Sequence, residues 1–126
     1  MEKLSRLKTW LAINIYHEAR GECKEGMIAV AHVCLNRALK KHLTVEDVIL
    51  QDYQFSWHNG NKFPAIEDYN AFIACIDVVQ DFLLDRLSGN DLSGATHYFN
   101  PALVKPKWAA KMKFIASIGG HDFYRE

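Results

Sequence analysis

Residues 25–41 read EGMIAVAHVCLNRALKK, and this stretch decides the fold. Its apolar positions are Met27, Ile28, Val30, Ala31, Val33, Cys34, Leu35 and Ala38. A helix that is apolar around so much of its circumference is typical of a buried element, whereas a surface helix carries one apolar stripe. We therefore predict a helix over residues 25–41 that lies at the centre of the hydrophobic core.

Two longer helices with one apolar stripe each are expected against this central helix. In residues 4–20 and 67–87 the apolar side chains recur every three or four positions, which is the helical period. Gly21 ends the first stripe, and Ser88-Gly89-Asn90 ends the second. The apolar residues are Leu4, Leu7, Leu11, Ile15 and Ala19 in the first stripe and Tyr69, Phe72, Ile73, Ile76, Val79, Leu83 and Leu87 in the second.

A short helix and a small sheet complete the expected fold. Thr44, with Asp47 three residues later, predicts an N-cap for a helix over residues 44–50. After residue 96 the chain is rich in β-branched and aromatic residues, and Gly119-Gly120 is a two-residue hairpin signal. The predicted fold class is α+β, a single mainly helical domain over residues 1–126 with a small C-terminal antiparallel β-sheet.

Composition excludes several classes of protein. The chain has 126 residues, and its 15 basic residues balance its 15 acidic ones, so no long-range field favours nucleic acid as a partner. The three cysteines form no close-spaced pair, which indicates reduced thiols, with Cys34 and Cys75 buried in helices. The apolar residues near the N-terminus are interrupted by polar ones before any cleavage site, so we expect synthesis in the cytoplasm without a signal peptide and no membrane insertion.

The densest group of reactive side chains is YHEARGE, residues 16–22. Glu18 falls in the last turn of the expected helix, where the negative end of the helix dipole raises the pKa of a carboxyl group. A carboxyl that stays protonated near neutral pH suits a general acid. The alternative interpretation is a structural ion pair of Glu18 or Glu22 with Arg20.

Two further segments carry groups that suit a sugar-binding site. In the aromatic-rich loop of residues 51–64, Gln54 and Ser56 lie beside Phe55, Trp57 and His58, and stacking faces mixed with polar groups are typical of such sites. Strand alternation places Tyr98 and Asn100 on one face and His97 and Phe99 on the other. The alternative for the loop aromatics is packing in the core.

A metal site is the less favoured interpretation of the six histidines. His17-Glu18 begins like the zinc-binding motif H-E-x-x-H, but the fifth position is Gly21. A scattered site using His32, His97 or His121 is the remaining option. We therefore predict no metal and no cofactor.

Five ordered motifs resemble one family of enzymes. IYHEARGE, GMIAVAHVCLNR, QFSW, ATHYFNP and IGGHDFY occur in this order between Leu11 and Tyr124. The chain resembles the SleB-like cell wall hydrolases of the spore cortex-lytic type. The resemblance implies a lysozyme-like fold related to lytic transglycosylases, with the first glutamate of EARGE, Glu18, as catalytic acid. Where relatives often have Pro and Gln, this chain has Cys23 and Met27.

The resemblance implies cleavage of the peptidoglycan glycan strand between N-acetylmuramic acid and N-acetylglucosamine. We expect a lytic transglycosylase with one catalytic glutamate and with Glu22, Gln54, Ser56, Tyr98 and Asn100 as substrate-binding residues. The alternatives are a hydrolytic muramidase, an amidase, or a non-catalytic glycan-binding module. The short chain resembles single-domain endolysins of bacteriophages, so we expect a monomer that acts on the cell wall in the periplasm.

Overall fold

In the described part of the chain, four helices come first and a small sheet comes last. A computed structural model describes residues 2–52 and 65–126. Within them lie α1 (Glu2–Ala19), α2 (Lys24–Lys41), α3 (Val45–Asp52) and α4 (Tyr69–Leu87). After a 3₁₀ turn, η1 (Leu92–Gly94), come β1 (His97–Phe99), a second 3₁₀ turn η2 (Lys107–Lys111), β2 (Lys113–Ile118) and β3 (His121–Arg125). The predicted α+β class is confirmed.

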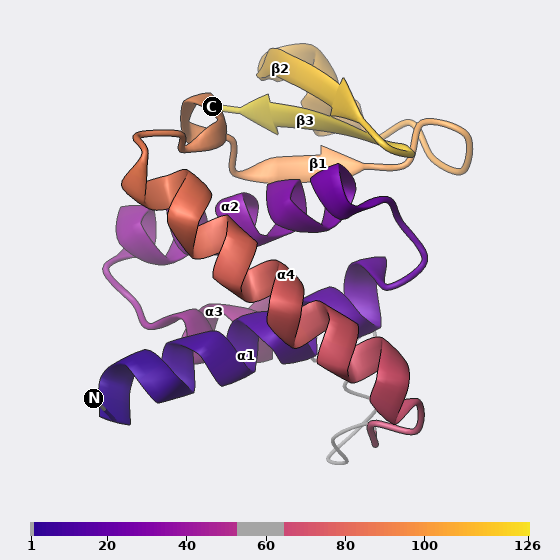
Figure 1. Cartoon of the computed structure of the whole chain (residues 1–126). Coiled ribbons are helices and arrows are strands. Elements are labelled where there is room, and N and C mark those ends of the chain that lie inside the picture. Colours follow the sequence, from indigo (N-terminus) through magenta and orange to yellow (C-terminus); the bar gives the residue numbers. More distant parts are fainter. Residues whose placement is uncertain (1, 53–64) are drawn as a thin grey trace.

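Helix α2 lies at the centre of the molecule, as its composition predicts. It contacts α1, α3 and α4 on one side and the sheet on the other (Figure 1). Its buried apolar side chains divide between two hydrophobic clusters: Ala31, Cys34 and Ala38 face the helices, whereas Ala29, Val30 and Val33 face the sheet. A helix with core on both sides needs apolar residues around most of its circumference.

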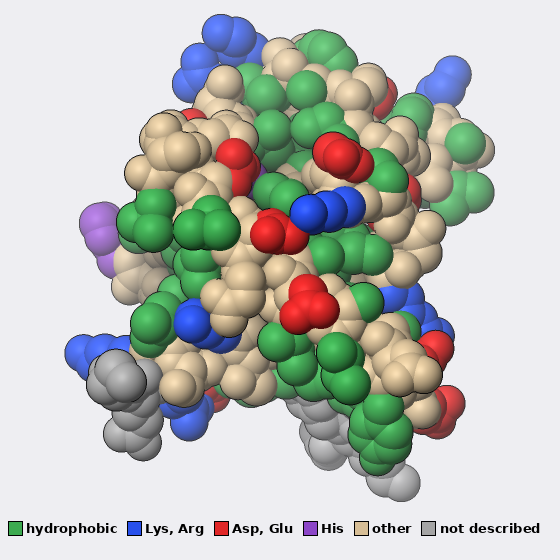
Figure 2. All heavy atoms as spheres, in the orientation of Figure 1, with side chains coloured by type: hydrophobic (Ala, Val, Ile, Leu, Met, Phe, Trp, Pro, Cys, Tyr) green, Lys and Arg blue, Asp and Glu red, His purple; other side chains and the backbone are tan. Residues whose placement is uncertain are grey.

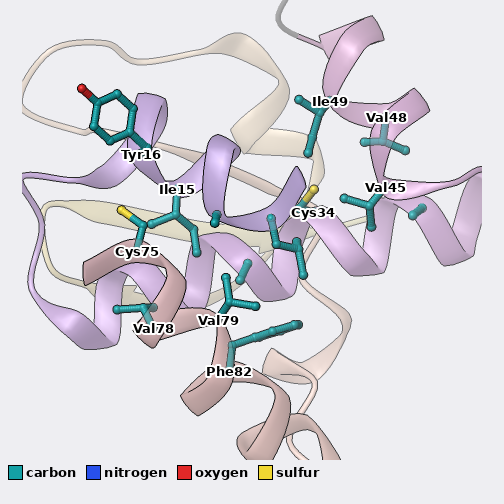
Figure 3. Packing of buried hydrophobic residues seen from close by; sticks show 14 residues of the cluster. Ile15, Tyr16, Cys34, Val45, Val48, Ile49, Cys75, Val78, Val79 and Phe82 are labelled. Atoms are coloured by element: carbon teal, nitrogen blue, oxygen red, sulfur yellow. The ribbon is translucent and has the colours of Figure 1, made fainter. Parts of the chain in front are cut away.

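The larger hydrophobic group, here named the helical cluster, fills the space between the four helices (Figure 3). Its buried members are Leu11, Ala12, Ile15, Tyr16, Ala31, Cys34, Ala38, Val45, Val48, Ile49, Cys75, Val78, Val79 and Phe82. Of the two predicted stripes, Leu11, Ile15 and Val79 are buried in it. The stripe predicted for α4 is largely wrong, because its buried side is formed by Cys75, Val78, Val79 and Phe82. The predicted residues Tyr69, Ile73, Ile76 and Leu87 are exposed. The spacing of apolar residues therefore predicted that α1 and α4 border the helical cluster but misplaced the buried side of α4.

The smaller group, the sheet cluster, joins the sheet to α2 and to the end of α1. It consists of Ala19, Ala29, Val30, Val33, Ala95 and Phe123. The strands are antiparallel in the order β1-β3-β2, with Tyr98 opposite Phe123. Gly119 has a φ of 60° in the turn between β2 and β3, a conformation that favours glycine, so the predicted hairpin is confirmed.

Side-chain caps fix the starts of α3 and α4, and the sequence predicted the first of them. The Asp47 N–H donates to Thr44 Oγ1 at 3.1 Å, which confirms Thr44 as the cap of α3. The α4 cap is Asp68, which accepts from the Ala71 N–H at 3.0 Å, so this helix begins two residues after the predicted start.

The outer side of α4 is mixed in character. Figure 2 shows hydrophobic side chains lying among acidic and basic ones over this helix. Tyr69, Ile73, Leu84 and Leu87 are exposed there. In the described part of the chain, no helix combines the length and the apolar character needed to cross a membrane.

Candidate active site

The predicted catalytic residue, Glu18, lies at the C-terminal end of α1. The helix ends at Ala19, whose carbonyl accepts from the Glu22 N–H at 2.9 Å. Ala19 is buried in the sheet cluster, and the Glu18 side chain beside it is half-buried. The predicted position of Glu18 in the last helical turn, at the negative end of the dipole, is therefore observed.

A tyrosine from the sheet holds the Glu18 carboxyl group. The Tyr98 O–H donates to Glu18 Oε2 at 3.2 Å, although the two residues are 80 positions apart in the chain. The Tyr98 ring packs on Phe123 of the sheet cluster, with ring centroids 5.6 Å apart. The contact thus depends on how the sheet docks over the end of α1.

Glu22 and Asn100 lie beside the turn between β2 and β3. The Gly120 N–H donates to Glu22 Oε2 at 3.3 Å. Asn100 follows β1; its Oδ1 accepts from the Ala102 N–H at 2.9 Å, and its Nδ2 lies close to Gly120. The end of α1, the end of β1 and this turn lie on the same side of the molecule (Figure 1).

The structure therefore brings together four of the six predicted site residues: Glu18, Glu22, Tyr98 and Asn100. As alternation predicts, His97 and Phe99 point the other way and pack on Trp108, with ring centroids 5.1 and 5.5 Å away. Gln54 and Ser56 lie outside the described residues, as do Phe55, Trp57 and His58.

Tyr16, the first residue of the YHEARGE segment, contacts the residues that lead into α4. The Tyr16 hydroxyl accepts from the backbone N–H groups of Glu67 and Asp68 at 3.2 and 3.1 Å, and the Arg20 guanidinium lies 4.5 Å from the Tyr16 ring centroid. Burial, and then the charge of Arg20, lowers the pKa of His17. A cation–π contact with Tyr16 was not anticipated from the sequence, which suggested only a carboxylate partner for Arg20.

Other polar and apolar features lie apart from Glu18. Burial raises the pKa of the Cys75 thiol to about 11, which leaves it unreactive in the core. An apolar hollow of about 370 Å³ near Trp10, between α1, α2 and α3, is eight residues, or roughly 12 Å, along α1 from Glu18. Among residues 2–52 and 65–126, no group of three or more His, Cys, Asp or Glu side chains is arranged to hold a metal ion.

Comparison with known proteins now identifies the family. A family model described as Cell Wall Hydrolase matches residues 21–124. The chain belongs to this family. The family match of this cell wall hydrolase begins after Glu18 and does not cover that residue.

The relatives of this cell wall hydrolase include spore cortex-lytic enzymes. Those of Oceanobacillus iheyensis and Bacillus subtilis are 37% and 34% identical over 117 residues, which is 90% of this chain but only 39% and 35% of those proteins. The chain thus spans less than half the length of these relatives.

Two solved structures resemble nearly the whole chain. The catalytic domain of a germination-specific lytic transglycosylase, SleB, from Bacillus anthracis is 29% identical with a TM-score of 0.69, covering 94% of this chain and 93% of that one. The catalytic domain of SleB from Bacillus cereus is 30% identical with a TM-score of 0.67, covering 95% and 91%. The predicted relation to SleB-like enzymes is confirmed.

His121 also lies in the site, although the sequence suggested it only as a member of a scattered metal site. Its Nδ1 lies 3.1 Å from Glu22 Oε1, and its ring meets the Tyr98 ring edge-on at a centroid distance of 5.1 Å. The IGGHDFY motif contained the signal, because a hairpin turn brings the residue that follows it back toward the sheet end. The motif indicated a hairpin but not the direction in which His121 points.

Proposed function

We propose that this chain cleaves the glycan strand of peptidoglycan between N-acetylmuramic acid and N-acetylglucosamine as a lytic transglycosylase, with Glu18 as its acid. The observation that carries the proposal is a half-buried carboxyl group at a helix C-terminus that accepts a hydrogen bond from Tyr98. Family membership and the likeness to catalytic domains of a lytic transglycosylase support it.

One carboxyl group is sufficient for this reaction. Glu18 donates its proton to the glycosidic oxygen as the bond from C1 of the muramoyl residue breaks and an oxocarbenium-like centre forms. The C6 hydroxyl of the same sugar then attacks C1, and its proton returns to the Glu18 carboxylate. The product is a 1,6-anhydro sugar, and no water is consumed. The C6 hydroxyl is held next to C1, so it competes well against a water molecule that must be positioned separately.

The neighbouring residues supply polar groups for the substrate. We propose that Tyr98 and Asn100 hold the N-acetyl group and hydroxyls of the sugar and stabilise developing charge. Gln54 and Ser56 remain predicted substrate contacts, and so does Glu22. The expected monomeric state, the periplasmic site of action and the phage origin also stay predictions.

Replacement of the acid tests the proposal directly. Glu18→Gln keeps the shape of the side chain but has no proton to donate, so we expect turnover of purified peptidoglycan to fall by about 10²–10⁴-fold. Circular dichroism checks the fold, and Glu25→Gln, at the exposed start of α2, is the matched control. A folded Glu18→Gln protein with full activity would remove Glu18 from the mechanism.

The product distinguishes the proposed reaction from a hydrolytic one. Mass spectrometry of the released fragments should show anhydromuramoyl ends, which differ from reducing ends by one water. Reducing muramic acid ends would identify a hydrolytic muramidase, and reducing N-acetylglucosamine ends would place the cut at the other glycosidic bond.

A further inference from the structure

Glu22 and His121 form a polar contact that the reaction described above does not use. His121 opens β3, and its side chain is only 13% exposed. Its buried Nδ1 lies 3.1 Å from Glu22 Oε1, without the alignment of a hydrogen bond. The opposite oxygen, Oε2, accepts from the Gly120 N–H. Both oxygens of the Glu22 carboxylate therefore have partners in the β2–β3 turn.

The turn is shaped around this carboxylate. A Cβ atom at Gly119 would lie 3.0 Å from Glu22 Oε2, and one at Gly120 would lie 3.3 Å from Oε1. Both distances are tighter than an ordinary contact of a Cβ atom, and Gly119 in addition has a positive φ. The two glycines thus leave the space in which Glu22 sits.

His121 connects Glu22 to Tyr98, because its ring also contacts the Tyr98 ring. The two rings meet edge to face, at an interplanar angle of 89°. This geometry is favourable for aromatic pairs. The Tyr98 ring also packs on Phe123, and its hydroxyl reaches Glu18. The position of the Tyr98 phenol is therefore set by Phe123 and His121 together.

We propose that Glu22 and His121 are positioning residues for the catalytic carboxyl group. Glu22 holds the turn and the imidazole, the imidazole holds the Tyr98 ring, and the Tyr98 hydroxyl restrains Glu18. The two partners of Glu22 favour this role over that of a base for water or a direct substrate contact. The inference rests on the proposed role of Glu18.

Steady-state kinetics on soluble peptidoglycan strands test this chain of contacts. We expect Tyr98→Phe, His121→Ala and Glu22→Gln each to lower kcat by about 10–100-fold, because a small misplacement of a catalytic group can cost that much. His121→Ala and Glu22→Gln should change KM little, since neither residue contacts the sugar in this account. Glu25→Gln is again the control. The double variant His121→Ala/Tyr98→Phe should be no slower than the slower single variant, since both act through one hydroxyl.

The pH profile supplies a readout that general damage to the fold would not move. The Tyr98 hydroxyl stabilises the ionised form of Glu18, so Tyr98→Phe should shift the alkaline limb of kcat to higher pH, and His121→Ala should shift it in the same direction. If His121→Ala does not fold, His121→Gln retains a polar side chain of similar length for the same measurements.

Three results would overturn the inference: an unchanged kcat in Glu22→Gln and His121→Ala, a raised KM alone in Glu22→Gln, or additive losses in the double variant. The outcome is separate from that of the proposed function, which fails only if Glu18→Gln stays active or the products are of another kind.

Discussion

The two hydrophobic clusters on either side of α2 differ in size and in what they hold in place. Among the described residues, the helical cluster has fourteen buried members and the sheet cluster six. Glu18 and Tyr98 both lie next to members of the smaller cluster, Ala19 and Phe123. Because buried apolar area dominates stability, most of the folding free energy comes from the helical cluster, whereas the sheet cluster sets the geometry of the site.

The largest expected effect on stability is in the helical cluster. Phe82 is completely buried, so Phe82→Ala should lower the free energy of unfolding by about 3–5 kcal/mol through lost burial and a cavity. Urea denaturation measures this loss. Activity per folded molecule should stay close to that of the parent, and a large loss of activity in fully folded protein would contradict the separation of the two clusters.

A substitution in the sheet cluster should lower activity more and stability less than Phe82→Ala does. Phe123→Leu keeps an apolar side chain but removes the ring on which Tyr98 packs. We expect a stability loss of about 1–3 kcal/mol. Activity should fall by more than in Phe82→Ala, because the Tyr98 hydroxyl is no longer held against Glu18. Equal activity of the two variants, each assayed under conditions in which it is fully folded, would contradict the claim that the sheet cluster sets the geometry of the site.

Lowering the pH should destabilise the packing of α2 against α4. His32 is 1% exposed; its Nε2 lies 2.8 Å from Asp85 Oδ2, and Arg86 donates to its Nδ1 at 3.2 Å. An arginine donates only, so the ring is neutral with its proton on Nε2. Burial lowers the pKa of His32 from 6.5, despite the opposing effect of Asp85.

The sign of the pH effect follows from this lowered pKa. Below about pH 6.5 the unfolded chain binds a proton at His32 that the folded chain does not, so stability is complete above that pH and falls as the pH drops toward the folded-state pKa. Urea unfolding at pH 7.5 and 5.5 should show the loss, and His32→Gln should reduce the difference. Burial also lowers the pKa values of His17 and His97, so these two residues contribute to the part of the pH-dependent stability loss that His32→Gln leaves. An unchanged difference in His32→Gln would contradict this assignment.

The smallest expected effect is at the cap of α3. Thr44→Ala removes the side-chain acceptor of the Asp47 N–H, so the free energy of unfolding should fall by about 1 kcal/mol. Thermal denaturation measures it, with Thr44→Ser as a control that keeps the hydroxyl. Activity should not change, because the cap belongs to the helical side of the molecule.

The sequence by itself determined the features that arise from neighbouring residues. The apolar positions of residues 25–41 predicted the central helix, Thr44 predicted a cap, and Gly119-Gly120 predicted the hairpin. Each of these depends on a backbone preference or on a period of a few residues, which a single chain displays directly. The position of Glu18 in the last turn of α1 followed from the same local signals.

Only the tertiary structure decided which groups surround Glu18. The Tyr98 hydroxyl is 80 residues away in the chain, and Gly120, which binds Glu22, is 98 residues from it. Neither the spacing of apolar residues nor a helix cap indicates that two residues so far apart in the chain are in contact. Glu22 points to the turn between β2 and β3, and Arg20 lies over Tyr16, because the sheet docks on one side of the end of α1 and α4 begins on the other. The direction of a polar side chain just beyond a helix end is set by the elements that pack there, and these come from distant parts of the chain.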